Sequence, residues 1–162
     1  GLEKDGQTGA ISTEPDNHHL MDHLRYEKVA NIDVPDLEVE GDKDDAELLI
    51  VGFGSTYGHL RAAMKGLRRK GYKVAMAQLK FINPLPKNTA NLLRKYKKVV
   101  VAEQNLGQLA ALRRIRINDF APYQYNQVKG QPFVVSELMS NFEKLILDKE
   151  ETVGETFESR VL

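Results

Sequence analysis

Buried strands that alternate with helical patterns constrain this sequence more than any other feature. Leu48–Val51 and Val99–Ala102 are continuous apolar runs, and Tyr72–Leu79 is a third candidate strand. Short apolar runs of this kind are typical of strands covered on both faces. Leu37–Gly41 and Tyr123–Val128 are two further candidates. The sequence therefore predicts a three-layer α/β/α domain, with helices on both faces of a mostly parallel sheet of about five strands.

Composition divides the 162 residues into three parts. Residues 1–45 are expected to form a linker with one helix and an acidic segment, and residues 46–147 the compact domain. Residues 148–162 are expected to form a polar tail. The first twelve residues are rich in glycine and polar side chains, which favours disorder or a flexible linker.

Helix starts are predicted from residues that favour the first turn. Pro15 shortly after Thr13 indicates a helix of about four turns. Asn88 or Thr89 can cap a short helix after the second strand, and Ser136 can cap the last helix. Right-handed crossovers then bring the loops that follow the parallel strands to one edge of the sheet. Any site on this domain is expected at that edge.

The net charge of zero hides a strong asymmetry. Residues 1–47 hold 14 acidic and 4 basic residues, a net charge of −10, whereas residues 48–162 hold 9 acidic and 19 basic, a net charge of +10. Such a split can indicate a polyanionic partner. The favoured interpretation is that the acidic segment lies against the chain's own basic face, or that partner subunits supply the counter-charge, because the basic residues fall on outer faces of the predicted helices.

The chain contains no cysteine, which excludes disulfides, a thiol nucleophile and a cysteine-held iron–sulfur cluster on this chain. No apolar run has the length that a bilayer span requires, and no signal peptide is visible, so we expect no membrane association and a cytoplasmic location. The chain begins with Gly rather than Met, which suggests a trimmed protein or a piece of a longer one.

Glycines follow the first buried strand in the stretch Gly52–Gly58. The pattern is close to a dinucleotide fingerprint, and backbone N–H groups at a helix start attract anions. The fingerprint also requires an acidic residue at the end of the next strand, where this chain has Gln78 and Lys80. The alternative is a tight turn in which Ser55 or Thr56 caps the helix with a hydroxyl group, and that alternative is favoured.

Histidines and basic clusters give weaker signals. His19 and His23 have the spacing of metal ligands on a helix, but no carboxylate completes the set, so we expect no metal site. Residues 68–70, 94–98 and 113–116 are rich in Arg and Lys. A nucleic-acid platform would need aromatic residues among them, and aromatic residues are only 7% of the chain, so solvated faces or subunit contacts are favoured.

The densest polar group at a strand end is Glu103-Gln104-Asn105-Leu106-Gly107-Gln108. Three side chains that form hydrogen bonds precede a predicted helix start, at the sheet edge that ligands prefer. The alternative is that Glu103 and Asn105 cap this helix and fix the neighbouring loops. Both interpretations remain open from the sequence.

Longer segments resemble a known family. "LLIVGFGSTYGHLRAAMKGLRRKGYKVAMAQLKFINPLP" followed by "KKVVVAEQNLGQL" is similar to transketolase C-terminal-like domains. "VAEQNLGQLAALRRIRI" and "VKGQPFVVSEL" resemble alpha subunits of 2-oxoacid:ferredoxin oxidoreductases, the 2-oxoglutarate type especially, and "STEPDNHHLMDHLRYEKV" is similar to their linking helix. The resemblance covers about residues 8–147. It implies a mixed sheet whose first short strand is antiparallel, a role that Leu37–Gly41 fits.

The resemblance also implies a function. In such enzymes thiamine diphosphate catalyses oxidative decarboxylation of a 2-oxoacid, coenzyme A accepts the acyl group, and iron–sulfur clusters pass electrons to ferredoxin. The diphosphate, its Mg²⁺ and the clusters are held mainly by other domains and a beta subunit. This chain would be the last domain of the alpha subunit, in contact with the rest of that subunit and with the beta subunit. It would bind no cofactor and hold no catalytic residue.

Residues at the strand ends are expected to border the active site or an interface: Gly54, Ser55, Glu103, Asn105, Gly107 and Gln108. The charge count places Arg113 and Arg114 in the vicinity of the coenzyme A phosphates. Two other functions remain as alternatives. One is a small nicotinamide-dinucleotide-binding domain that uses Gly52–Gly58, and the other is a non-enzymatic basic scaffold.

Overall fold

The computed structural model describes residues 2–117 and 120–147, except for the side chains of residues 113–116. Contacts divide the chain into two compact units. Unit 1 holds the residues up to Pro35 together with Phe81–Pro86, and unit 2 holds Asp36–Lys80 and the chain from Lys87 onward. No helix in the described part of the chain is long and apolar enough to cross a bilayer.

Unit 1 contains a hairpin and a helix. Strands β1 (Glu3–Lys4) and β2 (Ile11–Ser12) pair in antiparallel fashion, so the expectation of disorder at the start of the chain is wrong for these residues. Helix α1 (Pro15–Ala30) follows, with Glu14 rather than Thr13 as its N-cap residue. The Asn17 amide accepts a hydrogen bond from the Gly6 N–H and donates one to the Lys4 carbonyl, and this contact fixes the hairpin on the helix.

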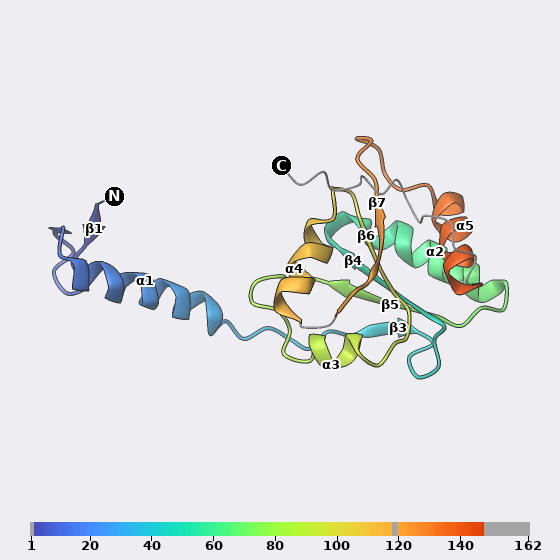
Figure 1. The fold of residues 1–162 in the computed structure, drawn as a ribbon, viewed down its shortest axis with the longest axis horizontal. Coiled ribbons are helices and arrows are strands. Elements are labelled where there is room, and N and C mark those ends of the chain that lie inside the picture. Colours follow the sequence, from blue (N-terminus) through green and yellow to red (C-terminus); the bar gives the residue numbers. More distant parts are fainter. Residues whose placement is uncertain (1, 118–119, 148–162) are drawn as a thin grey trace. The chain divides into compact units, whose positions relative to one another are not determined.

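Unit 2 is built on a five-stranded sheet (Figure 1). The strand order is β3 (Val39–Gly41), β5 (Val74–Leu79), β4 (Leu48–Phe53), β6 (Val99–Glu103) and β7 (Tyr123–Asn126). β3 is antiparallel to β5, and the other neighbours are parallel. The predicted fold class is confirmed, including the antiparallel first strand.

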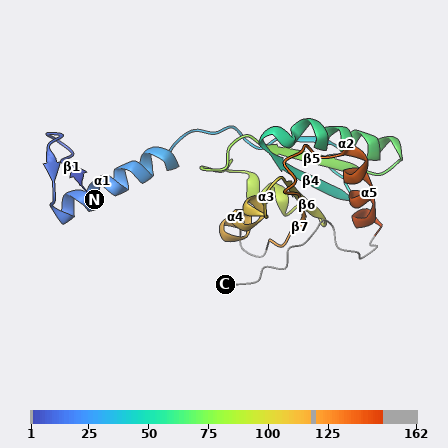
Figure 2. The same ribbon diagram turned by 90° about the horizontal axis from the view of Figure 1, so that it is seen from above.

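Helices cover both faces of this sheet. α2 (Tyr57–Arg69) lies on one face, whereas α3 (Thr89–Leu93) and α4 (Gln108–Arg116) lie on the other (Figure 2). α5 (Val135–Ile146) packs against α2 in one hydrophobic cluster. A 3₁₀ turn, η1 (Gly54–Thr56), joins β4 to α2.

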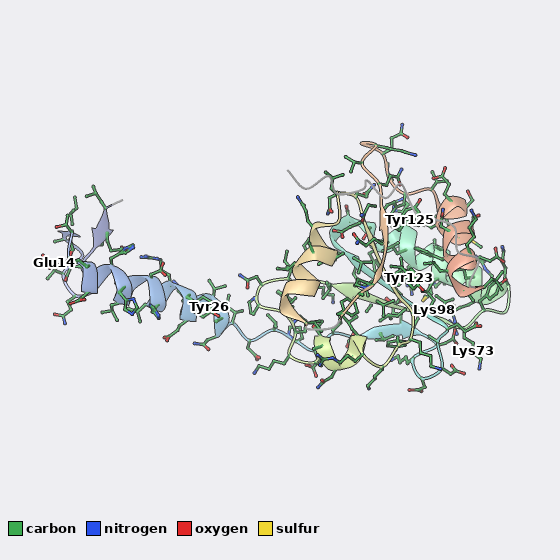
Figure 3. The ribbon with its side chains drawn as sticks, viewed as in Figure 1. Glu14, Tyr26, Lys73, Lys98, Tyr123 and Tyr125 are labelled. Carbon is green, nitrogen blue, oxygen red and sulfur yellow. The ribbon has the colours of Figure 1, made fainter. Side chains whose placement is uncertain are left out.

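The core follows the two-residue period of the strands. Leu48, Ile50 and Met76 point to the face that α2 and α5 cover, where Leu60 and Phe142 are fully buried. Each such side chain contributes roughly 1.5–3 kcal/mol when it leaves water. Tyr125 of β7, labelled in Figure 3, makes edge-to-face ring contacts with Phe133 and Phe142.

Two predicted helix caps differ in the structure. α5 begins at Val135 with Val134 as its N-cap residue, so Ser136 lies within the first turn and is not the cap. Asn88 is the N-cap residue of α3, as predicted, but its side chain makes no cap hydrogen bond. Its amide instead pairs with the backbone N–H and carbonyl of Leu37, at 2.8 and 3.0 Å.

Ion pairs connect the acidic segment to the basic face within unit 2. Asp42 accepts two hydrogen bonds from the Arg68 guanidinium, at 2.7 and 3.0 Å, and Glu40 accepts one from Arg61 at 2.7 Å. Asp45 pairs with Lys73. These contacts confirm, for residues 40–45, that the chain supplies its own counter-charge. Pairs as exposed as these contribute little to stability, because water and salt screen them.

Candidate functional site at the carboxyl edge of the sheet

The carboxyl ends of β5, β4, β6 and β7 lie at one edge of the sheet, because these four strands are parallel (Figure 1). In the pairing register, Gly52 lies beside Gln78 and Glu103 lies beside Asn126. The segments that follow β4 and β6 carry the candidate residues at this edge: Gly54, Ser55, Glu103, Asn105, Gly107 and Gln108. The structure therefore places all six at the same edge, in two separate joints between a strand and a helix.

Glu103 is the last residue of β6, and only 3% of it is exposed. One carboxylate oxygen accepts a hydrogen bond from the Leu109 N–H at 2.7 Å, and the other accepts one from the Ala110 N–H at 3.0 Å. These N–H groups belong to the first turn of α4, where helices lack internal partners. The carboxylate also has the favourable sign for the positive end of the helix dipole. Glu103 is thus a structural cap that acts across six residues of sequence.

Asn105 completes this cap. Its side-chain oxygen accepts hydrogen bonds from the Gly107 N–H at 2.8 Å and the Gln108 N–H at 2.9 Å. Four consecutive backbone N–H groups at the start of α4 are therefore occupied by two side chains of the chain itself. A phosphate at this helix start would have to displace both side chains and approach a buried carboxylate. The geometry favours the capping interpretation of this polar group.

Gly107 fixes the joint between β6 and α4. Its φ angle of 92° lies in the left-handed region, which side chains disfavour. A Cβ atom at this position would lie 2.5 Å from the Gln124 side-chain oxygen and 3.1 Å from the Asn126 side-chain nitrogen. Nearby, the Gln104 amide donates a hydrogen bond to the Gln131 carbonyl at 2.6 Å. This bond ties the loop after β6 to the loop after β7.

The joint between β4 and α2 is built differently. Gly54 has a φ angle of 64° and opens the 3₁₀ turn. Neither η1 nor α2 has a side-chain cap, so the expected hydroxyl cap is wrong. The Thr56 hydroxyl donates instead to the Phe53 carbonyl at 2.9 Å. The tight-turn interpretation holds without the cap.

Gln78 occupies the strand end where a dinucleotide site requires an acid. Its amide nitrogen donates to the Gly54 carbonyl at 3.0 Å. A Cβ atom at Gly52 would meet the Gln78 side-chain oxygen at 2.6 Å and a Leu60 methyl group at 2.4 Å. The chain's own side chains therefore fill the space above Gly52, and this packing explains why a glycine is needed there.

Sequence reasoning missed a set of amides at the same edge. Within the described residues, three buried side-chain oxygens have no hydrogen-bond partner: Gln78 Oε1, Asn126 Oδ1 and Gln127 Oε1. Gln78 and Asn126 lie in the last two residues of β5 and β7, and Gln127 directly follows β7. The signal available in the sequence was the presence of an amide residue at each strand end, Gln78 in one and Asn126-Gln127 in the other.

The other candidates contribute little to a site. The His23 ring nitrogen Nδ1 lies 2.9 Å from the His19 carbonyl oxygen, and the described residues bring no three metal-ligating side chains together. Arg61, Arg68 and Lys70 are paired with carboxylates, which reduces the charge of the basic face. The side chains of Arg113 and Arg114 lie outside the described residues.

Comparison with known proteins identifies the family. Residues 46–137 match the family model described as pyruvate:ferredoxin oxidoreductase core domain II. The chain belongs to this family. It is 48% identical to the 2-oxoglutarate oxidoreductase subunit KorA of Mycobacterium tuberculosis, over 85% of this chain and 21% of that protein. It is 30% identical to the alpha subunit of 2-oxoacid:ferredoxin oxidoreductase 2 of Aeropyrum pernix, over 94% of this chain and 25% of that protein.

A solved structure supports the same assignment. This chain superposes on the 2-oxoglutarate:ferredoxin oxidoreductase from Magnetococcus marinus, solved with 2-oxoglutarate, coenzyme A and succinyl-CoA bound. The superposition covers 88% of this chain and 26% of the Magnetococcus chain. The TM-score is 0.77 and the sequence identity is 31%. The family predicted from the sequence is confirmed, and it is favoured over the nicotinamide-binding and scaffold alternatives. This chain spans only about a fifth to a quarter of the length of these relatives.

Proposed function

We propose that this chain is a non-catalytic domain of the alpha subunit of a 2-oxoglutarate:ferredoxin oxidoreductase. The complete enzyme would decarboxylate 2-oxoglutarate oxidatively, form the acyl-CoA and pass the electrons to ferredoxin. The 48% identity to a 2-oxoglutarate oxidoreductase subunit, over 85% of this chain, supports that substrate. The structural role rests mainly on Glu103, because this buried carboxylate at the candidate edge is fully engaged in capping α4.

The residues of this chain do not fit the cofactors of such an enzyme. The chain has no cysteine to hold an iron–sulfur cluster. The diphosphate of thiamine diphosphate would meet a helix start at α4 that Glu103 and Asn105 already occupy. We therefore assign thiamine diphosphate, Mg²⁺ and the clusters to other domains of the alpha subunit and to a beta subunit, with ferredoxin as the partner of the assembled enzyme.

A dye-reduction assay tests the non-catalytic role. The 162-residue chain, supplied with thiamine diphosphate, Mg²⁺, coenzyme A and 2-oxoglutarate, should not reduce a viologen dye. The assembled enzyme that contains this chain should reduce it under the same conditions. Reduction by the chain alone would contradict the non-catalytic role, and failure of the assembled enzyme with 2-oxoglutarate but not with pyruvate would contradict the substrate assignment.

Coenzyme A offers a second test, which concerns Arg113 and Arg114. The charge distribution of the sequence supports a position of Arg113 and Arg114 near the phosphates of that cosubstrate. Reversing both charges in the assembled enzyme should raise the KM for coenzyme A and leave the KM for 2-oxoglutarate unchanged. Reversing Arg94 and Lys95 provides a matched control. An unchanged KM for coenzyme A would remove these two residues from its binding region.

A further inference from the structure

The carboxyl edge of the sheet is poor in charge. Residues 54–56, 104–107 and 127–134 follow β4, β6 and β7, and Lys129 is their only charged residue; Lys80 directly follows β5. In the whole chain, 28% of residues are charged. Phosphate-bearing ligands are bound by cationic side chains, which are sparse in these segments. Depletion of charge is instead the compositional mark of the core of a protein interface.

Large apolar side chains are exposed at the same edge. Phe53 is 39% exposed at the end of β4, and Leu106 is 66% exposed after β6. Val128 and Val134, on either side of the loop after β7, are 62% and 46% exposed. The hydrogen bond from Gln104 to the Gln131 carbonyl holds two of these loops together. Exposed apolar groups gathered on one edge mark a contact surface.

Two buried amide oxygens at this edge lack a hydrogen-bond donor within the described residues. Only 9% of Gln127 is exposed, yet its side-chain oxygen has no hydrogen-bond partner within the described residues. The same holds for Asn126 Oδ1. An unpaired buried acceptor costs free energy unless another group donates to it. Because these oxygens are buried in the folded chain, a donor can reach them only after local rearrangement, so they do not identify the partner.

We propose that this edge, defined by Phe53, Leu106, Val128 and Val134, is the docking surface for another folded domain of the same alpha subunit. The inference rests on the proposed function for its partner. The length of the relatives points to this occupant, because this chain spans 21–26% of them and most of each relative is polypeptide outside it. The low charge of the edge favours such a permanent, apolar contact over a soluble ligand.

Hydrogen exchange tests the surface directly. Within the described residues, the backbone N–H groups of residues 128–131 donate no hydrogen bond, so they should exchange fast in the 162-residue chain. In the full-length alpha subunit without its partner subunit, we expect peptides that cover residues 104–106 and 128–131 to exchange at least tenfold more slowly. Equal rates in the two proteins would overturn the proposal.

Other occupants give different results. Protection that appears only after the second subunit is added would assign the surface to that subunit and overturn our choice of partner. Protection in the 162-residue chain that grows with its concentration would assign it to a second copy. These outcomes are independent of substrate, so a failed assignment of 2-oxoglutarate in the dye assay would leave the exchange result unaffected.

Two variants sharpen this experiment. Leu106→Arg and Val128→Arg in the full-length alpha subunit should remove the protection of residues 128–131, because a buried Arg without a partner opposes docking. Tyr123→Arg is the matched control, because Tyr123 is a large, 45% exposed side chain at the opposite end of β7. All three variants should leave the melting temperature of the 162-residue chain unchanged. Retained protection in both edge variants would overturn the proposal.

Discussion

The two joints between strand and helix at the carboxyl edge differ in how the start of the helix is completed. After β6, the side chains of Glu103 and Asn105 occupy four N–H groups at the start of α4. After β4, a 3₁₀ turn leads into α2 with no side-chain cap, and the Gln78 amide closes over the Gly54 carbonyl. Both joints contain a glycine with a positive φ angle, Gly54 and Gly107.

The comparison shows that a glycine-containing turn does not define the chemistry of a helix start. What decides it is the side chain that a strand end places against the joint, Glu103 from β6 itself or Gln78 from the neighbouring β5. A buried carboxylate excludes an anion from α4, whereas a neutral amide covers the turn before α2. The first joint should therefore depend more on particular side chains than the second does.

The largest effect is expected from Glu103→Ala in the 162-residue chain. The substitution leaves the Leu109 and Ala110 N–H groups unpaired in a buried position, and it should lower the free energy of unfolding by about 3 kcal/mol. Urea denaturation measures this. Glu103→Gln keeps one acceptor and should cost less. A loss below about 1 kcal/mol in Glu103→Ala would show that water replaces the carboxylate and that the joint is not closed.

The two glycines give a smaller, paired difference. Gly107→Ala combines an unfavourable φ angle with a close approach to Gln124 and should cost about 2 kcal/mol. Gly54 has a φ angle of 64°, nearer the left-handed helical region, and no atom lies within 4 Å of a new Cβ, so Gly54→Ala should cost about 1 kcal/mol. Thermal unfolding of both variants gives the ranking. Equal losses would mean that the Gln124 side chain moves aside freely.

Asn105→Ala and Ser55→Ala compare the polar side chains of the two joints. Asn105 accepts two backbone hydrogen bonds at a helix start, so its loss should cost about 1 kcal/mol. Ser55 is exposed and supplies no cap, so its loss should stay within about 0.5 kcal/mol. Urea denaturation of both variants provides the measurement. A larger loss at Ser55 would reveal a cap at the second joint.

The smallest effect concerns pH at the start of α2. The Tyr57 hydroxyl donates to Glu40 at 2.6 Å, and this bond raises the pKa of Tyr57 above its usual 10.0. A raised pKa in the folded state stabilises the protein below the usual value, and that contribution is lost as the pH rises through the folded-state pKa. Ultraviolet titration should show that Glu40→Gln lowers the pKa of Tyr57.

Asp42→Asn is the matched control for this titration, because it removes the ion pair with Arg68 and leaves the bond between Tyr57 and Glu40 in place. On the acid side, hydrogen bonds from Tyr57 and Arg61 lower the pKa of Glu40 below its usual 4.5. The stability that they supply should therefore be lost as the pH falls below that value. An identical Tyr57 titration in both variants would exclude the role of Glu40.

Much of the fold was predictable from local pattern. The buried strands at Leu48–Val51 and Val99–Ala102 lie within β4 and β6, because runs covered on both faces leave a continuous apolar signal. The helix that begins at Pro15 was equally visible. The hairpin of residues 3–12 was not, because it is held by Asn17, beyond its own sequence.

The candidate site was predictable only in its position. Parallel strands have their carboxyl ends at one edge, so the sequence alone determined that Gly54, Glu103 and Asn105 would lie there. It also carried the segments that identify the family.

Only the tertiary structure decided what these residues do. Whether Glu103 binds a ligand or caps α4 depends on where the helix start lies relative to the strand end, and that is set by packing. The Asn88 amide likewise pairs with Leu37, 51 residues away, and not with its own helix. A polar side chain has several partners within reach, and its choice among them depends on contacts distant in sequence, which local pattern does not encode.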